Sequence, residues 1–293
     1  MKPGEPLWVD ITDDWLDDEY SSEPEIAEIQ RFLGKKVKAE VIRRHLLAEG
    51  IGKPGALEIR HIETETSARR PHELTIKAMI RVEGVAWKDK DPETGLFVEN
   101  TDHKLIKKDA ILMRRTFIKN DRGDVDRAYF DTMGVGKAKL PDNFGREYYK
   151  RAIPLLRKLE VTSVDTEPTT EADDPKREEG RYIGAYVWPR YGYKNTNMNE
   201  TLDEFLKYIQ NDRKIKLSDE EAYDIKSITI MNKLSGHEIA RDDQKVKVGS
   251  DFLKGYDANG KPTRGVSWHG TIPDIHNNAS PEMVMMIEEL LRK

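Results

Sequence analysis

The residues best suited to chemistry gather in residues 184–195, where the sequence reads GAYVWPRYGYKN. The aromatic side chains of this stretch are Tyr186, Trp188, Tyr191 and Tyr193, and two basic residues, two glycines and a proline lie among them. Basic surfaces with aromatic rings stack nucleic-acid bases, and rings also line pockets for small ligands. The stretch therefore predicts a pocket wall or a packed core, and these roles are favoured over catalysis for the set.

Composition excludes several kinds of site elsewhere in the chain. The 293 residues include no cysteine, which excludes disulfides, thiolate zinc sites and cysteine nucleophiles. The histidines lack the spacing of a metal motif, so no metal site is expected. The formal net charge of −5 disfavours a general nucleic-acid coat. No apolar run approaches about eighteen residues and the start lacks a signal-peptide pattern, so we expect a cytoplasmic protein without a membrane span.

The elements that must position these residues begin with an acidic segment at residues 10–25. This segment is expected to form an exposed arm or an irregular cap. Apolar residues recur at helical spacing in residues 25–34 and 38–50, and these stretches end at Gly34 and Gly50. We therefore expect two short helices that pack on something larger.

From residue 56 the period of the apolar residues changes from about 3.6 to about 2, which predicts strands. The predicted strands are residues 56–66, 73–87, 109–121 and 125–135. Three or four consecutive strands, mostly antiparallel, should therefore precede Gly134. On the third of these strands, the neighbouring Arg114 and Arg115 are expected to be solvated.

A helix is predicted after these strands, with Asp142 or Asn143 as its N-cap. Its apolar stripe consists of Tyr149, Ile153, Leu156 and Leu159. Pro154 lies inside the helix and should kink it. Further elements are a short strand at residues 162–167 and helices near residues 202–209, 218–230 and from residue 281.

This order of elements over residues 73–194 resembles the GNAT acyltransferase superfamily. In that family the loop after the fourth strand presents backbone N–H groups to the pyrophosphate of coenzyme A, beside a helix N-terminus that favours negative charge. The resemblance implies that the matching residues here bind the cofactor, namely Asn143, Phe144, Gly145 and Arg146. Gly145 permits close approach of the backbone, and Arg146 adds a side-chain contact to phosphate.

A second match lies at residues 188–193, which resemble the short helix that runs into a Gly-aromatic pair in that family. Pro189 suits the first turn of such a helix and Gly192 suits its left-handed end. With a late Trp-x-Gly element at Trp268, the pattern is similar to GNAT-like domains associated with phages and toxins.

The same resemblance implies the catalytic groups. It points to a carboxylate near the end of the fourth or fifth strand as general base, here Glu167 or Asp131, and to a tyrosine that protonates the leaving thiolate. The usual tyrosine position carries Trp188, whose indole is not a useful acid. Tyr186 or Tyr191 is the substitute. The phosphate loop also departs from the family, because only one glycine lies close to the helix.

The sequence thus predicts an α+β fold with a GNAT-like, mostly antiparallel central sheet flanked by helices. Residues 1–55 form an acidic, helical extension, residues 56–197 the GNAT-like core, and residues 198–293 a helical, loop-rich cap. The expected activity is transfer of an acetyl group from acetyl-coenzyme A to the amine of a small molecule or protein.

Two other functions stay open. The domain could instead be an inactive binding or structural module, for instance a phage-encoded one that engages a host or virion protein through residues 10–25 and 168–180. Nucleic-acid binding is the least favoured function because of the net charge. The residues for it are Arg177, Arg181, Arg190 and Lys194.

Overall fold

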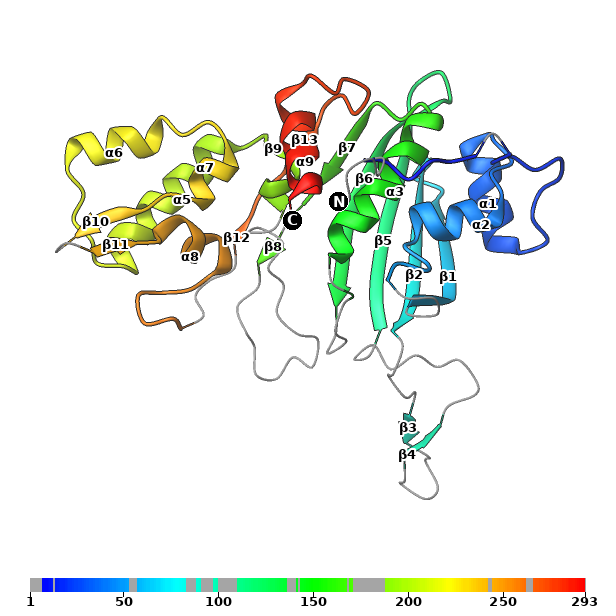
Figure 1. Ribbon diagram of the computed structural model, residues 1–293, viewed down its shortest axis with the longest axis horizontal. Helices are drawn as coiled ribbons and strands as arrows, with labels where there is room; N and C mark the ends of the chain where they lie inside the picture. The colour runs from blue at the N-terminus through cyan, green and yellow to red at the C-terminus, as the bar shows by residue number, and fades with distance from the viewer. Residues whose placement is uncertain are drawn as a thin grey trace. The chain divides into compact units, whose positions relative to one another are not determined.

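The computed structural model (Figure 1) describes residues 7–12, 14–52, 57–82, 88–90, 97–99, 110–135, 141, 143–167, 169–170, 188–241, 244–261 and 266–292. The chain forms two compact units. The first unit comprises Met1–Val164, Glu178–Gly180 and Leu290–Lys293, and the second comprises Asp165–Arg177 and Arg181–Glu289.

The first unit is built on four long antiparallel strands in the order β1-β2-β5-β6. Their bounds are Leu57–Ser67 for β1, Arg70–Val82 for β2, Ala110–Lys119 for β5 and Val125–Val135 for β6. These are the four predicted strands, which are thereby confirmed. β7 (Ser163–Thr166) follows β6 in the sheet, and a separate hairpin pairs β3 (Lys88–Lys90) with β4 (Phe97–Glu99).

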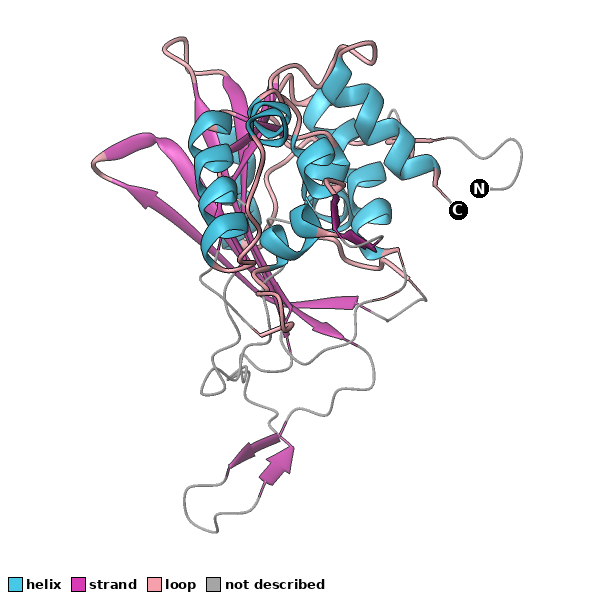
Figure 2. Ribbon diagram, turned by 90° about the vertical axis from the view of Figure 1, so that its left-hand side faces the viewer, coloured by secondary structure: helices cyan, strands magenta, loops and turns pink. Residues whose placement is uncertain are grey.

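Helices of the first unit lie on one side of these strands (Figures 1 and 2). They are α1 (Pro24–Leu33), α2 (Ala39–Val41), the π-helix η1 (Ile42–Leu46) and α3 (Phe144–Lys158). On β2, the buried side chains alternate with half-buried ones that are polar except for Met79, and the buried ones are Leu74, Ile76, Ala78 and Ile80. Because only one face of the sheet carries the core, the strands show the period of 2 that predicted them.

Of the two predicted N-terminal helices, the first ends at the predicted glycine and the second ends earlier than predicted. α1 ends at Gly34, which has a left-handed φ of 67°. The second helix passes into η1 and stops at Leu46, before the expected Gly50. The buried Ala48, with a φ of 63°, makes the first left-handed turn after it. The acidic segment before α1 is irregular and mostly exposed, and it is held to the unit by the buried Ile11 and by backbone hydrogen bonds at Trp15 and Asp17.

The second unit holds the remaining helices and several short strands. Its helical elements are η3 (Trp188–Tyr191), α5 (Met198–Asn211), α6 (Asp219–Lys226), α7 (Met231–Ser235), α8 (Val248–Lys254) and α9 (Pro281–Leu291), whose last two residues belong to the first unit. Its short strand pairs are β8 (Thr169–Thr170) with β12 (Val266–Ser267), β10 (Ile239–Arg241) with β11 (Gln244–Val246), and β9 (Lys194–Asn195) with β13 (Gly270–Ile272).

β7 runs from the first unit into the second, where β13 and β9 follow it in the strand order. Over the described part of the chain, the central sheet therefore contains seven strands in the order β1-β2-β5-β6-β7-β13-β9. Its long strands are all antiparallel. The chain is an α+β protein with a mostly antiparallel central sheet, as predicted. Among the residues that the structure describes, no helix is both long enough and apolar enough to cross a bilayer.

Candidate functional site

The start of α3 is the first candidate site, because the sequence predicts a phosphate-binding loop there. Asn143, the residue before the helix, has left-handed backbone angles with φ 60° and ψ 20°. Within the described residues, no side chain makes a capping hydrogen bond at this end, so the predicted cap by Asn143 is wrong, while Asp142 lies outside them. The backbone N–H of Phe144, the first residue of the helix, donates to the carbonyl of Pro141 at 3.1 Å. The helix start therefore offers a ligand the backbone at Gly145 and the positive end of the helix dipole.

At this helix start, Phe144 packs in the core, whereas Gly145 and Arg146 lie nearer the surface. Phe144 is buried, and its ring stacks on the ring of Tyr148 with 6.3 Å between centroids. Gly145 and Arg146 are half-buried. The Arg146 guanidinium donates a hydrogen bond to the backbone carbonyl of Arg292. Phe144 therefore fixes the helix start, while the next two residues remain near the surface.

A β-bulge lies on β6, one loop before α3. Arg114 on β5 pairs with Thr132 on β6, but the next residue, Arg115, pairs with Phe130. Asp131 is therefore the extra residue of the bulge. Bulges bend a strand and are frequent beside active sites. The structure places this predicted general base at an irregular point of the sheet, and its side chain lies outside the described part.

Arg115 forms a buried polar network between the sheet and α3. It is 1% exposed, so the prediction that it is solvated is wrong, whereas Arg114 is exposed. The Arg115 Nε–H donates to the Tyr148 hydroxyl at 2.9 Å, and that hydroxyl donates to the carbonyl of Leu46 at 3.2 Å. The guanidinium carbon lies 4.5 Å from the ring centroid of Phe130 and 5.1 Å from that of Tyr148. These ring faces stabilise the buried cation.

Burial sets the protonation state of this network. Removal from water raises the pKa of the Tyr148 hydroxyl, because the phenolate is the charged form. The nearby Arg115 opposes this effect but is the smaller influence. The hydroxyl therefore stays neutral, and it serves as both acceptor and donor.

The predicted aromatic stretch forms a packed cluster in the second unit. Trp188, Tyr191 and Tyr193 are between 2% and 9% exposed. The ring centroid of Trp188 lies 6.4 Å from that of Tyr191 and 5.4 Å from that of Tyr193. Their burial agrees with the packing role predicted for the set. An acid role for Tyr191 stays a prediction, and Tyr186 lies outside the described residues.

Two glycines allow this cluster to pack closely. Gly192 has a φ of 82°, and a Cβ there would lie 2.0 Å from the carbonyl oxygen of Glu282. A Cβ at Gly270 would lie 2.6 Å from Cζ3 of Trp268. Only glycine fits at these positions without a shift of neighbouring atoms. Gly192 therefore ends η3 with a left-handed residue, as predicted, and it also makes room for α9.

Glu167, the other predicted base, lies in the second unit near a histidine. Its Oε1 is 3.9 Å from Nε2 of His269, and both side chains are about half exposed. A carboxylate and an imidazole at this separation can exchange a proton through a small movement or one water. The two residues are about a hundred positions apart in the sequence, so no local pattern could reveal the pair.

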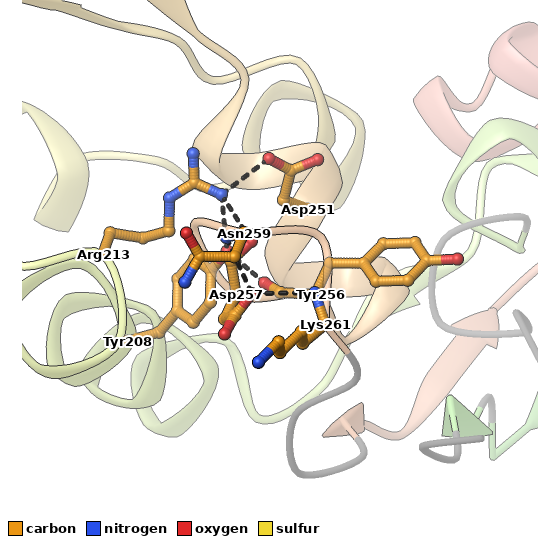
Figure 3. Close-up of polar contacts among 7 residues, drawn as sticks. All are labelled: Tyr208, Arg213, Asp251, Tyr256, Asp257, Asn259 and Lys261. Carbon is orange, nitrogen blue, oxygen red and sulfur yellow. Dashed lines mark hydrogen bonds and ion pairs between the residues drawn. The ribbon is translucent and has the colours of Figure 1, made fainter. Parts of the chain in front are cut away.

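The second unit also holds a polar network that sequence reasoning missed (Figure 3). Arg213 Nη1 donates to Asp251 Oδ2 at 2.9 Å and to the backbone carbonyl of Asp257 at 3.0 Å. The Tyr208 hydroxyl donates to the carbonyl of Tyr256 at 2.5 Å. Burial is the main reason that the pKa of Tyr208 rises to about 12.

This network fixes an exposed turn. Asp257 Oδ1 accepts hydrogen bonds from the backbone N–H groups of Asn259 and Lys261, each at 2.8 Å. The side chain of Tyr256 points away from Arg213 (Figure 3). The contacts therefore join α5, α8 and the turn, and they account for its shape without a ligand.

The predicted site residues fall in different units. Asn143, Phe144, Gly145, Arg146 and Asp131 belong to the first unit, and Glu167 and Tyr191 to the second. Assembly of these groups into one active site stays a prediction. Comparison with protein-family models, with curated proteins and with solved structures finds no match for this chain. The resemblance to the GNAT superfamily remains an expectation from the sequence.

Proposed function

We propose that the protein binds acetyl-coenzyme A at the start of α3 and transfers its acetyl group to an amine. The observation that carries the proposal is the bulge at Asp131 on β6, followed along the chain by the uncapped start of α3 at Phe144. A bulge bends a strand and increases its local twist. The backbone at Gly145 and the positive end of the helix dipole would attract a pyrophosphate.

The residues at this helix start would divide the work of binding. The backbone at Gly145 lets phosphate oxygens approach, because no Cβ stands in the way. Arg146 would exchange its bond to the Arg292 carbonyl for a charge-assisted bond to phosphate. That exchange replaces a neutral acceptor with a charged one, so it favours the bound state.

In the reaction, the amine nitrogen forms a bond to the thioester carbonyl carbon and the carbon–sulfur bond breaks. The attacking amine loses a proton, which the resemblance assigns to Asp131 or Glu167 as acceptor. The leaving thiolate gains a proton, and the resemblance assigns its donation to Tyr186 or Tyr191. No covalent enzyme intermediate is needed, because both substrates bind together.

A second function, a binding module without catalysis, is favoured by one specific observation. Arg146, the proposed phosphate ligand, already donates to the Arg292 carbonyl. If this contact is permanent, the helix start is a structural junction between α3 and the end of α9. The segment proposed for partner binding at residues 168–180 lies almost wholly outside the described residues.

Thermal unfolding with acetyl-coenzyme A separates the two functions. A ligand present at about a hundred times its Kd stabilises the folded state by about 2.7 kcal/mol, which raises the unfolding midpoint. Gly145→Val should abolish the rise, because the side chain blocks the backbone. Gly236→Val is the control, since Gly236 is exposed, lies at the end of another helix and has a negative φ of −87°. Its variant should keep the rise.

If saturating acetyl-coenzyme A does not raise the unfolding midpoint of the wild-type protein, the proposal is overturned. The binding module is then the remaining function. If the unfolding midpoint of Gly145→Val still rises with acetyl-coenzyme A, the cofactor binds somewhere other than the start of α3. Turnover can be followed by thiol release with a panel of amines. The chain has no cysteine, so the protein itself gives no thiol signal.

A further inference from the structure

The middle of α3 contains a hydrogen-bonding defect that the N-terminal segment repairs. Pro154 has no backbone N–H, so it cannot donate to the carbonyl of Lys150 as a helical residue at that position would. The backbone N–H of Val9 donates to this carbonyl instead, at 3.0 Å. Val9 belongs to residues 7–18, here called the N-terminal strap.

The strap also contacts the last turn of α3. Lys158 Nζ donates to the backbone carbonyl of Ile11 at 2.8 Å. The guanidinium carbon of Arg157 lies 5.1 Å from the ring centroid of Trp8, and the Lys158 ammonium lies 5.4 Å from that of Trp15. These are cation–π distances. The last turn therefore supplies cations, and the strap supplies rings and a carbonyl.

The far end of the strap is tied to the segment that links α1 to α2. Leu16 forms a β-bridge with Val37, and the backbone N–H of Lys38 donates to the carbonyl of Trp15 at 2.9 Å. The strap is thus anchored at residues 15–16. The side chain of Ile11 is buried and is a second anchor. Residues 7–10 contact α3 through the Val9 backbone hydrogen bond and the Trp8 ring, and so they form the end of the strap that opens first.

A second outside donor reaches α3 close to Pro154. The His45 ring, through Nδ1, bonds to the carbonyl of Arg151 at 3.1 Å. The Arg151 guanidinium donates to the carbonyls of Glu49 and Gly50 at 3.1 and 3.4 Å. Two neighbouring carbonyls beside Pro154 are therefore bound from outside the helix, one by the strap and one by η1.

We propose that the N-terminal strap is a detachable latch on α3, which completes the hydrogen bonding of the helix at Pro154. With the latch closed, Lys150 has its donor and both halves of α3 are held together. With the latch lifted, that carbonyl loses its donor and the half of α3 after Pro154 opens more readily. The same helix begins at the proposed cofactor site, so the latch also controls that site. This last step rests on the proposed function.

The test removes the latch bond without removing the strap. Val9→Pro deletes the N–H donor, and Val9→Ala is its matched control because it shortens the same side chain and keeps the N–H. Hydrogen exchange of the amides in residues 151–158 is the measurement. Val9→Pro should speed their exchange about tenfold or more, the effect of losing one bond to a buried backbone group. Val9→Ala should leave it near the wild-type rate.

A second background makes the test specific. Pro154→Ala restores an N–H inside the helix that can donate to the Lys150 carbonyl. In this background Val9→Pro should no longer speed exchange. Equal effects of Val9→Pro and Val9→Ala, or equal effects of Val9→Pro with and without Pro154→Ala, overturn the latch.

Should Val9→Pro not fold, Trp8→Leu lifts the same end of the strap while keeping every backbone donor, and it should speed the same amides. Unchanged exchange in that variant also overturns the latch. Acetyl-coenzyme A binding provides the second readout, with affinity expected to fall about tenfold in Val9→Pro. If the wild-type protein does not bind the cofactor, the proposed function fails while the exchange experiment still decides the latch. If the wild-type protein binds it and Val9→Pro binds equally well, the control of the site is overturned.

Discussion

Replacing Tyr148 with phenylalanine is the sharpest perturbation of the first unit. The change removes one hydroxyl and keeps the ring that packs between Phe144 and Arg115. That hydroxyl accepts from Arg115 Nε at 2.9 Å and donates to the carbonyl of Leu46 at 3.2 Å. Tyr148→Phe therefore leaves the buried Arg115 Nε–H without its acceptor. It also leaves the carbonyl of Leu46, the last residue of η1, without this donor.

The expected cost follows from these two lost bonds. A buried group that loses its partner costs about 1–3 kcal/mol, and a charged donor lies toward the upper end. The Leu46 bond is longer and links neutral groups, so its share is smaller. Together they predict a loss of about 2–4 kcal/mol in the free energy of unfolding, a large part of the roughly 5–15 kcal/mol of a typical domain.

Urea unfolding measures this loss, and a double-mutant cycle with Arg115→Met assigns it. With a slope of about 1–3 kcal/mol per molar urea, the midpoint should fall by about 1 M or more. In the Arg115→Met background, Tyr148→Phe should cost only the share of the Leu46 carbonyl, about 1 kcal/mol. A loss below about 0.5 kcal/mol in the wild-type background, or equal losses in both backgrounds, would refute this account of the network.

Two further predictions concern packing and pH. Gly192→Ala should destabilise the second unit by more than about 3 kcal/mol in urea unfolding, because its Cβ would lie 2.0 Å from the Glu282 carbonyl oxygen. Gly123→Ala, at the similar φ of 87° with open space around it, should cost only about 1 kcal/mol, and equal costs would contradict the clash. Burial is the main cause that lowers the pKa of His45 and of His237 below 6.5. The unfolded chain therefore binds more protons below about pH 6.5, so stability should be full above that pH and should fall as the pH drops toward the folded-state pKa values. A urea midpoint that stays constant between about pH 7.5 and 5.0 would contradict this.

The long strands and α3 could be predicted from the sequence because each buries one face, which leaves a periodic pattern of apolar residues. The sheet of the first unit is buried on one face, so its strands alternate, and α3 lies on that face with an apolar stripe. The π-helix η1 escaped prediction because its residues repeat at nearly the spacing of an α-helix. Its left-handed end also lies at Ala48 rather than at a glycine, and only the tertiary contacts of this buried residue explain that choice.

The site residues were predictable only where a local pattern carried the information. Arg115 lies in register with Met113 and Phe117, both of which are buried, so the alternation itself placed this cation on the core face. The prediction that Arg114 and Arg115 are both solvated relied on their charge and ignored the alternation of buried and exposed positions along the strand. By contrast, the bulge at Asp131 depends on which β5 residue pairs with which β6 residue. The Val9 donor likewise depends on a tertiary contact, so no single stretch contains either feature.

The contacts along α3 explain how this helix can begin without a side-chain cap. A missing N-cap costs a helix about 1 kcal/mol, a penalty that proteins usually avoid. Here the sides of α3 are held by the Tyr148 hydroxyl, by the Val9 N–H at Lys150 and by the His45 ring. Stability supplied along the helix makes a side-chain cap at its end unnecessary, and the Phe144 N–H finds its acceptor in the carbonyl of Pro141. A local rule that is broken at one end and compensated elsewhere is the pattern expected of a binding site. The same contacts explain why the latch and the proposed cofactor site would be coupled, because both depend on how firmly this one helix is held.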